Sequence, residues 1–183
     1  MDVLKHGILG LLNYGEMTGY EIHEAFESSL KFFWPAQTSQ IYRELTVLEK
    51  NKWIVKRTVE QSGKPNKKIC SITEEGRREL LRWLSSPDIP AEMRSPTLMK
   101  VFFMGALPGF ESLSFFKRLH KEYECGWEAL QQTGLSIASY QELIPDKQNA
   151  LFWKMTADFG KRYTQMYLQW IEDCIHILES MEE

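Results

Sequence analysis

The stretch QTSQIYRELTVLEKNKWIVKRTVEQSGKPNKKICSI, residues 37–72, decides the fold of this chain. Its first part predicts an amphipathic helix, because apolar residues recur there at helical spacing and form one stripe. The stripe consists of Ile41, Leu45 and Leu48. Thr38 or Ser39 is expected to cap the start of this helix, since a short hydroxyl accepts a hydrogen bond from a free backbone N–H.

The polar front of this helix carries side chains that are able to contact DNA. Gln, Tyr and Arg at the front of a helix reach base edges or phosphates. The candidate DNA-binding residues of the helix are Thr38, Ser39, Gln40, Tyr42 and Arg43. The alternative is an ordinary surface for Tyr42 and Arg43, with Tyr42 half-buried because it follows Ile41 of the stripe.

Two short β-runs follow the helix. Residues 54–59 alternate with a two-residue period, residues 67–72 form the returning run, and residues 61–66 between them supply Gly, Pro and Asn for a turn. A helix followed by a β-hairpin with a basic tip is the order of a winged helix-turn-helix. The position on a wing favours contact with phosphates or the minor groove over a merely solvated charge run. The basic residues concerned are Lys64, Lys67 and Lys68.

The charge of the chain is unevenly distributed. The net charge of −3 argues against nucleic acid. Residues 50–82, however, contain ten basic and four acidic residues, which is +6, whereas residues 87–183 contain nine basic and fourteen acidic residues, which is −5. A basic wing region attached to an acidic body is typical of a protein that touches DNA at one end.

Three further helices are expected around the deciding stretch. The first spans residues 3–12, and its apolar residues are interpreted as core. The second spans residues 19–30, because Thr18 and Glu21 form a T-x-x-E capping box. After the hairpin, Thr73 is expected to cap a third helix with acidic residues in its first turn, where they suit the helix dipole.

A proline-rich stretch divides the chain. Residues 87–96 contain three prolines and predict a linker between a first domain, residues 1–86, and a second domain, residues 97–183. The second domain is expected to be helical, with Gly134 ending or kinking one of its helices. The helices predicted there span residues 98–107, residues 110–133, and a last segment from Asp146 or Asn149 to Met181.

The last helix carries a long apolar stripe with spacings of 3, 4, 4, 3, 4, 4, 3 and 4 from Phe152 to Met181. This eleven-residue repeat keeps the stripe on one face with little supercoil. A helix of about 45–50 Å is long for a domain of ~90 residues to cover alone, so a second copy of the chain is expected to pair with it. The predicted dimerisation residues are Phe152, Phe159, Tyr163, Met166, Trp170 and Ile177.

No pattern in the sequence supports catalysis, a metal site or a cofactor. The three cysteines lack CxxC spacing and an even count, which argues against a disulfide framework and fits a reducing cytoplasm. The histidines are scattered without metal-ligand spacing. No apolar run approaches the roughly 18 residues of a membrane span, and the short apolar N-terminus lacks the features of a signal peptide.

Three short stretches resemble the signature motifs of PadR-type transcriptional regulators, in matching order and separation. They are TGYEI at residues 18–22, QIYREL at residues 40–45 and ITEEG at residues 72–76. The second half is similar, by length and layout, to the C-terminal helical dimerisation domain of the longer PadR subfamily with its virulence-activator-type members. The resemblance implies that some members bind aromatic effectors. Candidate pocket residues, for which core packing is the alternative, are Trp127, Trp153 and Tyr167.

The expected fold is mainly α with a small β-hairpin: an N-terminal winged helix-turn-helix followed by a C-terminal helical dimerisation domain. The expected protein is a cytoplasmic homodimer that binds a palindromic double-stranded DNA operator, without catalytic activity or membrane attachment. A repressor is favoured over an activator, and a small aromatic effector remains open. The alternative is a winged-helix module for protein contacts that never touches DNA, for which the overall acidity is the best argument.

Overall fold

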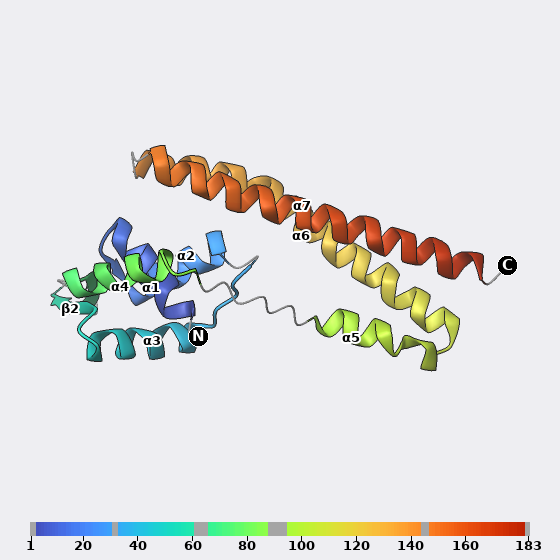
Figure 1. Ribbon diagram of the computed structural model, residues 1–183, viewed down its shortest axis with the longest axis horizontal. Coiled ribbons are helices and arrows are strands. Elements are labelled where there is room, and N and C mark those ends of the chain that lie inside the picture. The colour runs from blue at the N-terminus through green and yellow to red at the C-terminus, as the bar shows by residue number, and fades with distance from the viewer. Residues whose placement is uncertain (1–2, 31–32, 61–65, 88–94, 144–146, 182–183) are drawn as a thin grey trace. The chain divides into compact units, whose positions relative to one another are not determined.

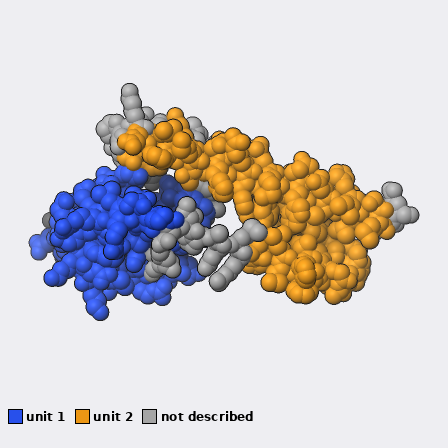
Figure 2. All heavy atoms as spheres, in the orientation of Figure 1, with its two compact units in different colours: residues 1–89 blue, residues 90–183 orange. Residues whose placement is uncertain are grey.

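The chain folds as two compact units, residues 1–89 and residues 90–183 (Figure 2). Helices dominate both units, and the described strands form one three-stranded antiparallel sheet in the first, so the predicted fold class is confirmed. The predicted linker, residues 87–96, lies almost wholly outside the described residues, and its bounds stay a prediction. The computed structural model describes residues 3–30, 33–60, 66–87, 95–143 and 147–181, with the backbone alone described for residues 129–143 and 147.

The first unit begins with α1 (Val3–Tyr14), β1 (Met17–Thr18) and α2 (Gly19–Ala25), which continues as the π-helical turn η1 (Phe26–Leu30). The predicted capping box is present. The Thr18 hydroxyl accepts from the Glu21 N–H at 3.2 Å, and the Glu21 carboxylate accepts from the Thr18 N–H at 2.7 Å. Strand β1 was not expected, because two residues carry no alternation and are extended here only through pairing with β3.

Helix α3 (Thr38–Lys50) buries the predicted stripe completely or nearly so. The expected cap is wrong by one residue, because Gln37 and not Thr38 or Ser39 is the N-cap. The Gln37 carbonyl accepts from the N–H groups of Gln40 and Ile41, and its own N–H donates to the Gln40 side-chain oxygen at 2.9 Å. A glutamine pair therefore closes the start of this helix in place of a hydroxyl.

The hairpin consists of β2 (Ile54–Val59) and β3 (Lys67–Ile72), and the sheet order is β1-β3-β2. The register pairs Ile54 with Ile72 and Val59 with Lys67. Helix α4 (Glu74–Leu84) follows at once, with the Thr73 hydroxyl accepting from the Gly76 N–H at 3.1 Å as predicted for this cap. The described part of the unit is thus a winged helix with four α-helices, and the central strand of its sheet, β3, pairs with both neighbours.

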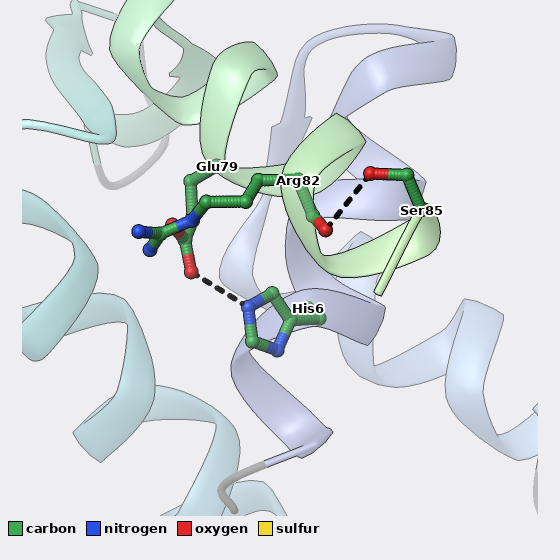
Figure 3. A network of polar contacts seen from close by, with 4 residues as sticks. All are labelled: His6, Glu79, Arg82 and Ser85. Atoms are coloured by element: carbon green, nitrogen blue, oxygen red, sulfur yellow. Dashed lines mark hydrogen bonds and ion pairs between the residues drawn. The ribbon is translucent and has the colours of Figure 1, made fainter. Parts of the chain in front are cut away.

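A buried polar contact joins α1 to α4 inside this unit (Figure 3). His6 Nε2 lies 2.9 Å from Glu79 Oε1, and the second Glu79 oxygen accepts from Arg82. The His6 ring also stacks on Trp83, with 4.7 Å between ring centroids. Burial acts to raise the pKa of Glu79, but the contacts with His6 and Arg82 outweigh it and hold that pKa below its usual value. The charged form of Glu79 therefore stabilises the α1–α4 contact.

The second unit consists of α5 (Pro96–Phe102), the 3-10 turn η2 (Met104–Ala106), α6 (Gly109–Leu143) and α7 (Lys147–Ser180). Helices α6 and α7 lie side by side as an antiparallel pair (Figure 1). The single helix predicted over residues 98–107 is instead α5, capped by Ser95, followed by a separate 3-10 turn. Gly134 does not end α6, because one glycine costs only about 1 kcal/mol in a helix, little for a helix of 35 residues.

The core of the second unit lies between α6 and α7. Its buried members are Met104, Phe116, Leu119, Tyr167 and Ile171. Tyr167 stacks on Tyr123 at 4.8 Å between centroids and lies 4.9 Å from Tyr163. Burial, and then the hydrogen bond with Tyr167, raise the pKa of Tyr163 to about 12. The phenol of Tyr163 therefore stays neutral at physiological pH.

Candidate nucleic-acid interface

The exposed face of α3 lies opposite its buried stripe. Ser39, Tyr42, Arg43 and Thr46 recur at intervals of three and four residues and are all exposed, with Tyr42 50% accessible. Within the described part of the chain, no carboxylate lies within 4 Å of the Arg43 guanidinium. The guanidinium is therefore available to a base edge or a phosphate, as its sequence position predicts.

Two other predicted DNA-binding side chains on α3 already have partners within the protein. The Thr38 hydroxyl lies 3.3 Å from His23 Nε2 on α2. The Gln40 side-chain oxygen accepts from the Gln37 N–H, which leaves its amide NH₂ as the group able to face outward. Both side chains thus contribute to holding the start of α3, a role that spacing alone does not show.

The wing offers fewer free cations than its sequence count indicates. Lys67 and Lys68 on β3 are exposed and have no acidic partner within 4 Å among the described residues, whereas Lys64 lies outside those residues. Among the described residues, acids pair with five of the ten basic residues counted between positions 50 and 82. The paired residues are Lys56, Arg57, Arg77, Arg78 and Arg82.

Glu16, which sequence reasoning missed, is the residue before β1 and contacts both strands of the wing. One carboxylate oxygen accepts from the Ser71 hydroxyl at 2.6 Å, and the other accepts from Arg57 at 2.5 Å. The bond from Ser71, followed by that from Arg57, lowers the pKa of Glu16. A lone glutamate ahead of a strand carries no sequence signal for this role, because its partners lie 55 and 41 residues away.

The apolar stripe of α7 is largely uncovered within one chain. Phe152, Phe159, Tyr163, Met166 and Ile177 are between 44% and 64% exposed, while the residues that α7 buries against the rest of its unit occupy other positions. Trp170 is different, because its ring lies 5.8 Å from Phe116 and belongs partly to the core of the second unit. The structure therefore leaves most of the predicted dimerisation face available to a partner.

The predicted pocket residues do not come together in one chain. Trp127 lines a shallow open hollow with Gln165, Met166, Leu168, Gln169 and Glu172. Tyr167 is buried in the tyrosine cluster, and Trp153 lies 14 residues before it on α7, about 21 Å along the helix axis. One small ligand cannot touch both of these side chains on a single subunit.

Across the described ranges of the chain, no three potential metal ligands gather into one group. No described helix is long and apolar enough to cross a membrane.

The arrangement defines a winged helix-turn-helix protein with a helical second unit. Residues 8–82 match the Transcriptional regulator PadR-like family, and residues 93–179 match the Virulence activator alpha C-term family. The negative transcriptional regulator PadR of Bacillus subtilis is 31% identical over 188 residues, which cover 98% of this chain and 99% of that protein. The chain therefore belongs to the PadR-like family of transcriptional regulators, as the three signature stretches predicted.

Two solved structures of Bacillus subtilis PadR resemble this fold over nearly the whole chain. The complex with operator DNA has a TM-score of 0.79 at 30% identity and covers 96% of this chain and 99% of its own. The complex with p-coumaric acid has a TM-score of 0.73 at 28% identity and covers 97% and 99%. A family member of the same architecture thus binds DNA in one crystal and a phenolic acid in another.

Proposed function

We propose that this chain is a homodimeric repressor that binds a specific DNA operator and responds to a small aromatic ligand. The observation that carries the proposal is the exposed face of α3, where Tyr42 and Arg43 are adjacent and exposed, and where Arg43 has no acidic partner within 4 Å among the described residues. A relative that matches this chain from end to end is a negative regulator and has been crystallised with its operator.

In this proposal α3 reads base edges and the wing grips the backbone. Arg43 binds guanine in the major groove, where a bidentate contact separates bases most clearly. Lys67 and Lys68 contact phosphates, which adds affinity without sequence information. Lys64 is assigned the same role from its place in the sequence. Such a protein acts where chromosomal DNA lies, which places it in the cytoplasm, and its work requires no chemical catalysis.

In this proposal two chains pair through α7, so that the dimer carries two DNA-binding winged helices. The exposed stripe from Phe152 to Ile177 is apolar over much of the helix length, and a closed two-fold pairing would bury the same patch on both subunits. Two identical heads related by a two-fold axis read a palindromic operator. We assign the domain division to residues 1–86 and 97–183, with residues 87–96 as the linker.

The effector part of the proposal rests on the Bacillus subtilis relative seen with p-coumaric acid. The Trp127 hollow is the candidate on one subunit, since it combines an aromatic wall with two glutamine side chains. An effector of this kind releases DNA only if it binds the DNA-free state more tightly than the DNA-bound state. Calorimetry with p-coumaric acid as probe, with and without operator, measures that difference directly.

The test of DNA binding is a titration at two salt concentrations. The probes are a duplex from the region upstream of the chain's own gene and duplexes selected by the protein from a random pool. Specific binding predicts a preferred sequence and an affinity that falls steeply with salt, because each neutralised phosphate releases counterions. A protein that selects no sequence and binds with no salt dependence would be a protein-contact module instead.

A further inference from the structure

Helix α2 holds two side chains of the α3 reading face in register. Thr38 meets His23 through the 3.3 Å contact between its hydroxyl and the ring nitrogen Nε2. One turn further along α3, the ring of Tyr42 packs against Gly19. The α2 partners are also one turn apart, at positions 19 and 23, so the two contacts repeat at the pitch of both helices.

The contact at Gly19 leaves no room for a side chain. A Cβ atom placed on Gly19 would lie 2.8 Å from Cε1 of Tyr42, 3.0 Å from Cζ and 3.1 Å from the hydroxyl oxygen. Real Cβ atoms essentially never approach a neighbour closer than 3.0 Å. The Thr18–Glu21 capping box fixes the backbone of α2 around Gly19. Any residue other than glycine at this position would therefore push the Tyr42 ring and its hydroxyl away from their present position.

The Tyr42 ring packs against Gly19 and is half exposed. Gly19 is buried beneath it, whereas the tyrosine side chain keeps 50% of its surface accessible. A tyrosine with one packed side and a free edge presents its hydroxyl at a defined place at little cost in side-chain entropy on binding. The hydroxyl group is able to donate to an acceptor on a base edge.

We propose that Gly19 is a positioning residue for operator recognition, acting through Tyr42. The glycine of the TGYEI stretch permits the close approach of α2 to α3, and that approach sets where the Tyr42 hydroxyl stands on the reading face. This inference rests on the proposed DNA-binding function and adds to it the contact that orients the Tyr42 side chain. Gly19 itself touches no DNA in this account.

A double-mutant cycle tests the proposal on the full chain. The variants are Gly19→Ala, Tyr42→Ala and the combination, with Gly10→Ala as matched control because nothing lies within 4 Å of a Cβ placed there. The measured quantity is selectivity, the ratio of affinities for a duplex selected from a random pool and for a shuffled duplex of equal length and composition. Both affinities are measured at one salt concentration, because the phosphate contribution depends on salt.

Gly19→Ala should lower selectivity roughly twofold to tenfold, the effect of holding one side chain off its rotamer. Affinity for the shuffled duplex should stay the same, because the cations of the wing are untouched. In the Tyr42→Ala background the added methyl should have no further effect, and Gly10→Ala should match the wild type. Equal losses in both backgrounds would overturn the proposal, since they would show that Gly19 acts on the fold in general.

A second measurement does not depend on the folding of the Gly19 variant. The Tyr42 ring should shift the NMR resonances of the Gly19 amide and α-protons by its ring current, and Tyr42→Ala should abolish that shift without moving those of Gly10. Unchanged Gly19 resonances would refute the packing and the proposal with it.

Two outcomes separate this inference from the function on which it rests. If the wild type selects a sequence and Tyr42→Ala selects it equally well, DNA binding stands and the positioning role of Gly19 is refuted. If the wild type selects no sequence at all, the proposed function fails and the inference fails with it.

Discussion

Replacement of Gly76 by alanine should destabilise the first unit more than any other single methyl added to its described glycines. Gly76 lies in the first turn of α4, where a Cβ atom would stand 2.1 Å from the carbonyl oxygen of Trp53 and 2.9 Å from Cγ1 of Ile72. The first of these is a backbone atom that cannot rotate away. The same carbonyl accepts from the Thr73 N–H at 2.9 Å, so displacing it breaks the bond that joins the helix cap to the start of the hairpin.

The magnitude follows from these contacts. Relief of the clash requires a backbone movement of about 1 Å. Overpacking costs about 1–3 kcal/mol and a buried carbonyl without its donor about 1–3 kcal/mol, while alanine returns about 1 kcal/mol of helix propensity. The expected loss in the free energy of unfolding is therefore about 1–5 kcal/mol.

Urea unfolding of the full chain, followed by far-UV circular dichroism at fixed protein concentration, measures this loss. The concentration is fixed because the stability of a dimer depends on it. Gly10→Ala is the matched control: it adds the same methyl inside α1 where nothing lies within 4 Å, and it should be neutral or stabilise by up to about 1 kcal/mol. If Gly76→Ala unfolds at the wild-type urea concentration, the close approach of α4 to Trp53 is absent in solution and the reasoning is wrong.

Three other predictions follow from the described contacts. The pKa of Glu79 in the folded protein lies below its ordinary value of 4.5, so the stability that its charge contributes is present above pH 4.5 and disappears as the pH falls through the lower folded value. Glu79→Gln should therefore be less stable than the wild type at pH 7, and urea unfolding should show this difference shrinking in acid. A difference that stays constant with pH would contradict this prediction. Arg43→Ala should cost about 1–3 kcal/mol per half-site in operator affinity and relax base preference at one position, with unchanged sedimentation; an unaltered base preference would exclude Arg43 from direct reading. Phe159→Asp, at an exposed position on α7, should shift the proposed dimer toward monomer in sedimentation velocity because an unpaired charge is costly in an apolar interface, and an unchanged sedimentation coefficient would contradict pairing through this face.

Features that depend on residues close together in the chain were predictable from the amino-acid sequence. Helical spacing identified the buried stripe of α3, and two motifs identified the caps at Thr18 and Thr73, because an amphipathic stripe and a cap are local properties of a few turns. The alternation of residues 54–59 and the turn after them predicted the hairpin in the same way. The three signature stretches, in their order along the chain, identified the family. Each stretch is short and contiguous, so it is readable from the sequence without knowledge of tertiary contacts.

Contacts between residues distant in the sequence became visible once the chain was folded. Strand β1 exists because Met17 and Thr18 pair with Cys70 and Ile69, and two residues have no period of their own. The charge count of the wing did not reveal that Glu16 neutralises Arg57 from 41 residues away. Likewise, the glycine at position 19 looks like the first residue of an ordinary helix until the fold brings the Tyr42 ring against it. The physical reason is that packing and ion pairing depend on distance in space, whereas periodicity and capping depend on distance along the chain.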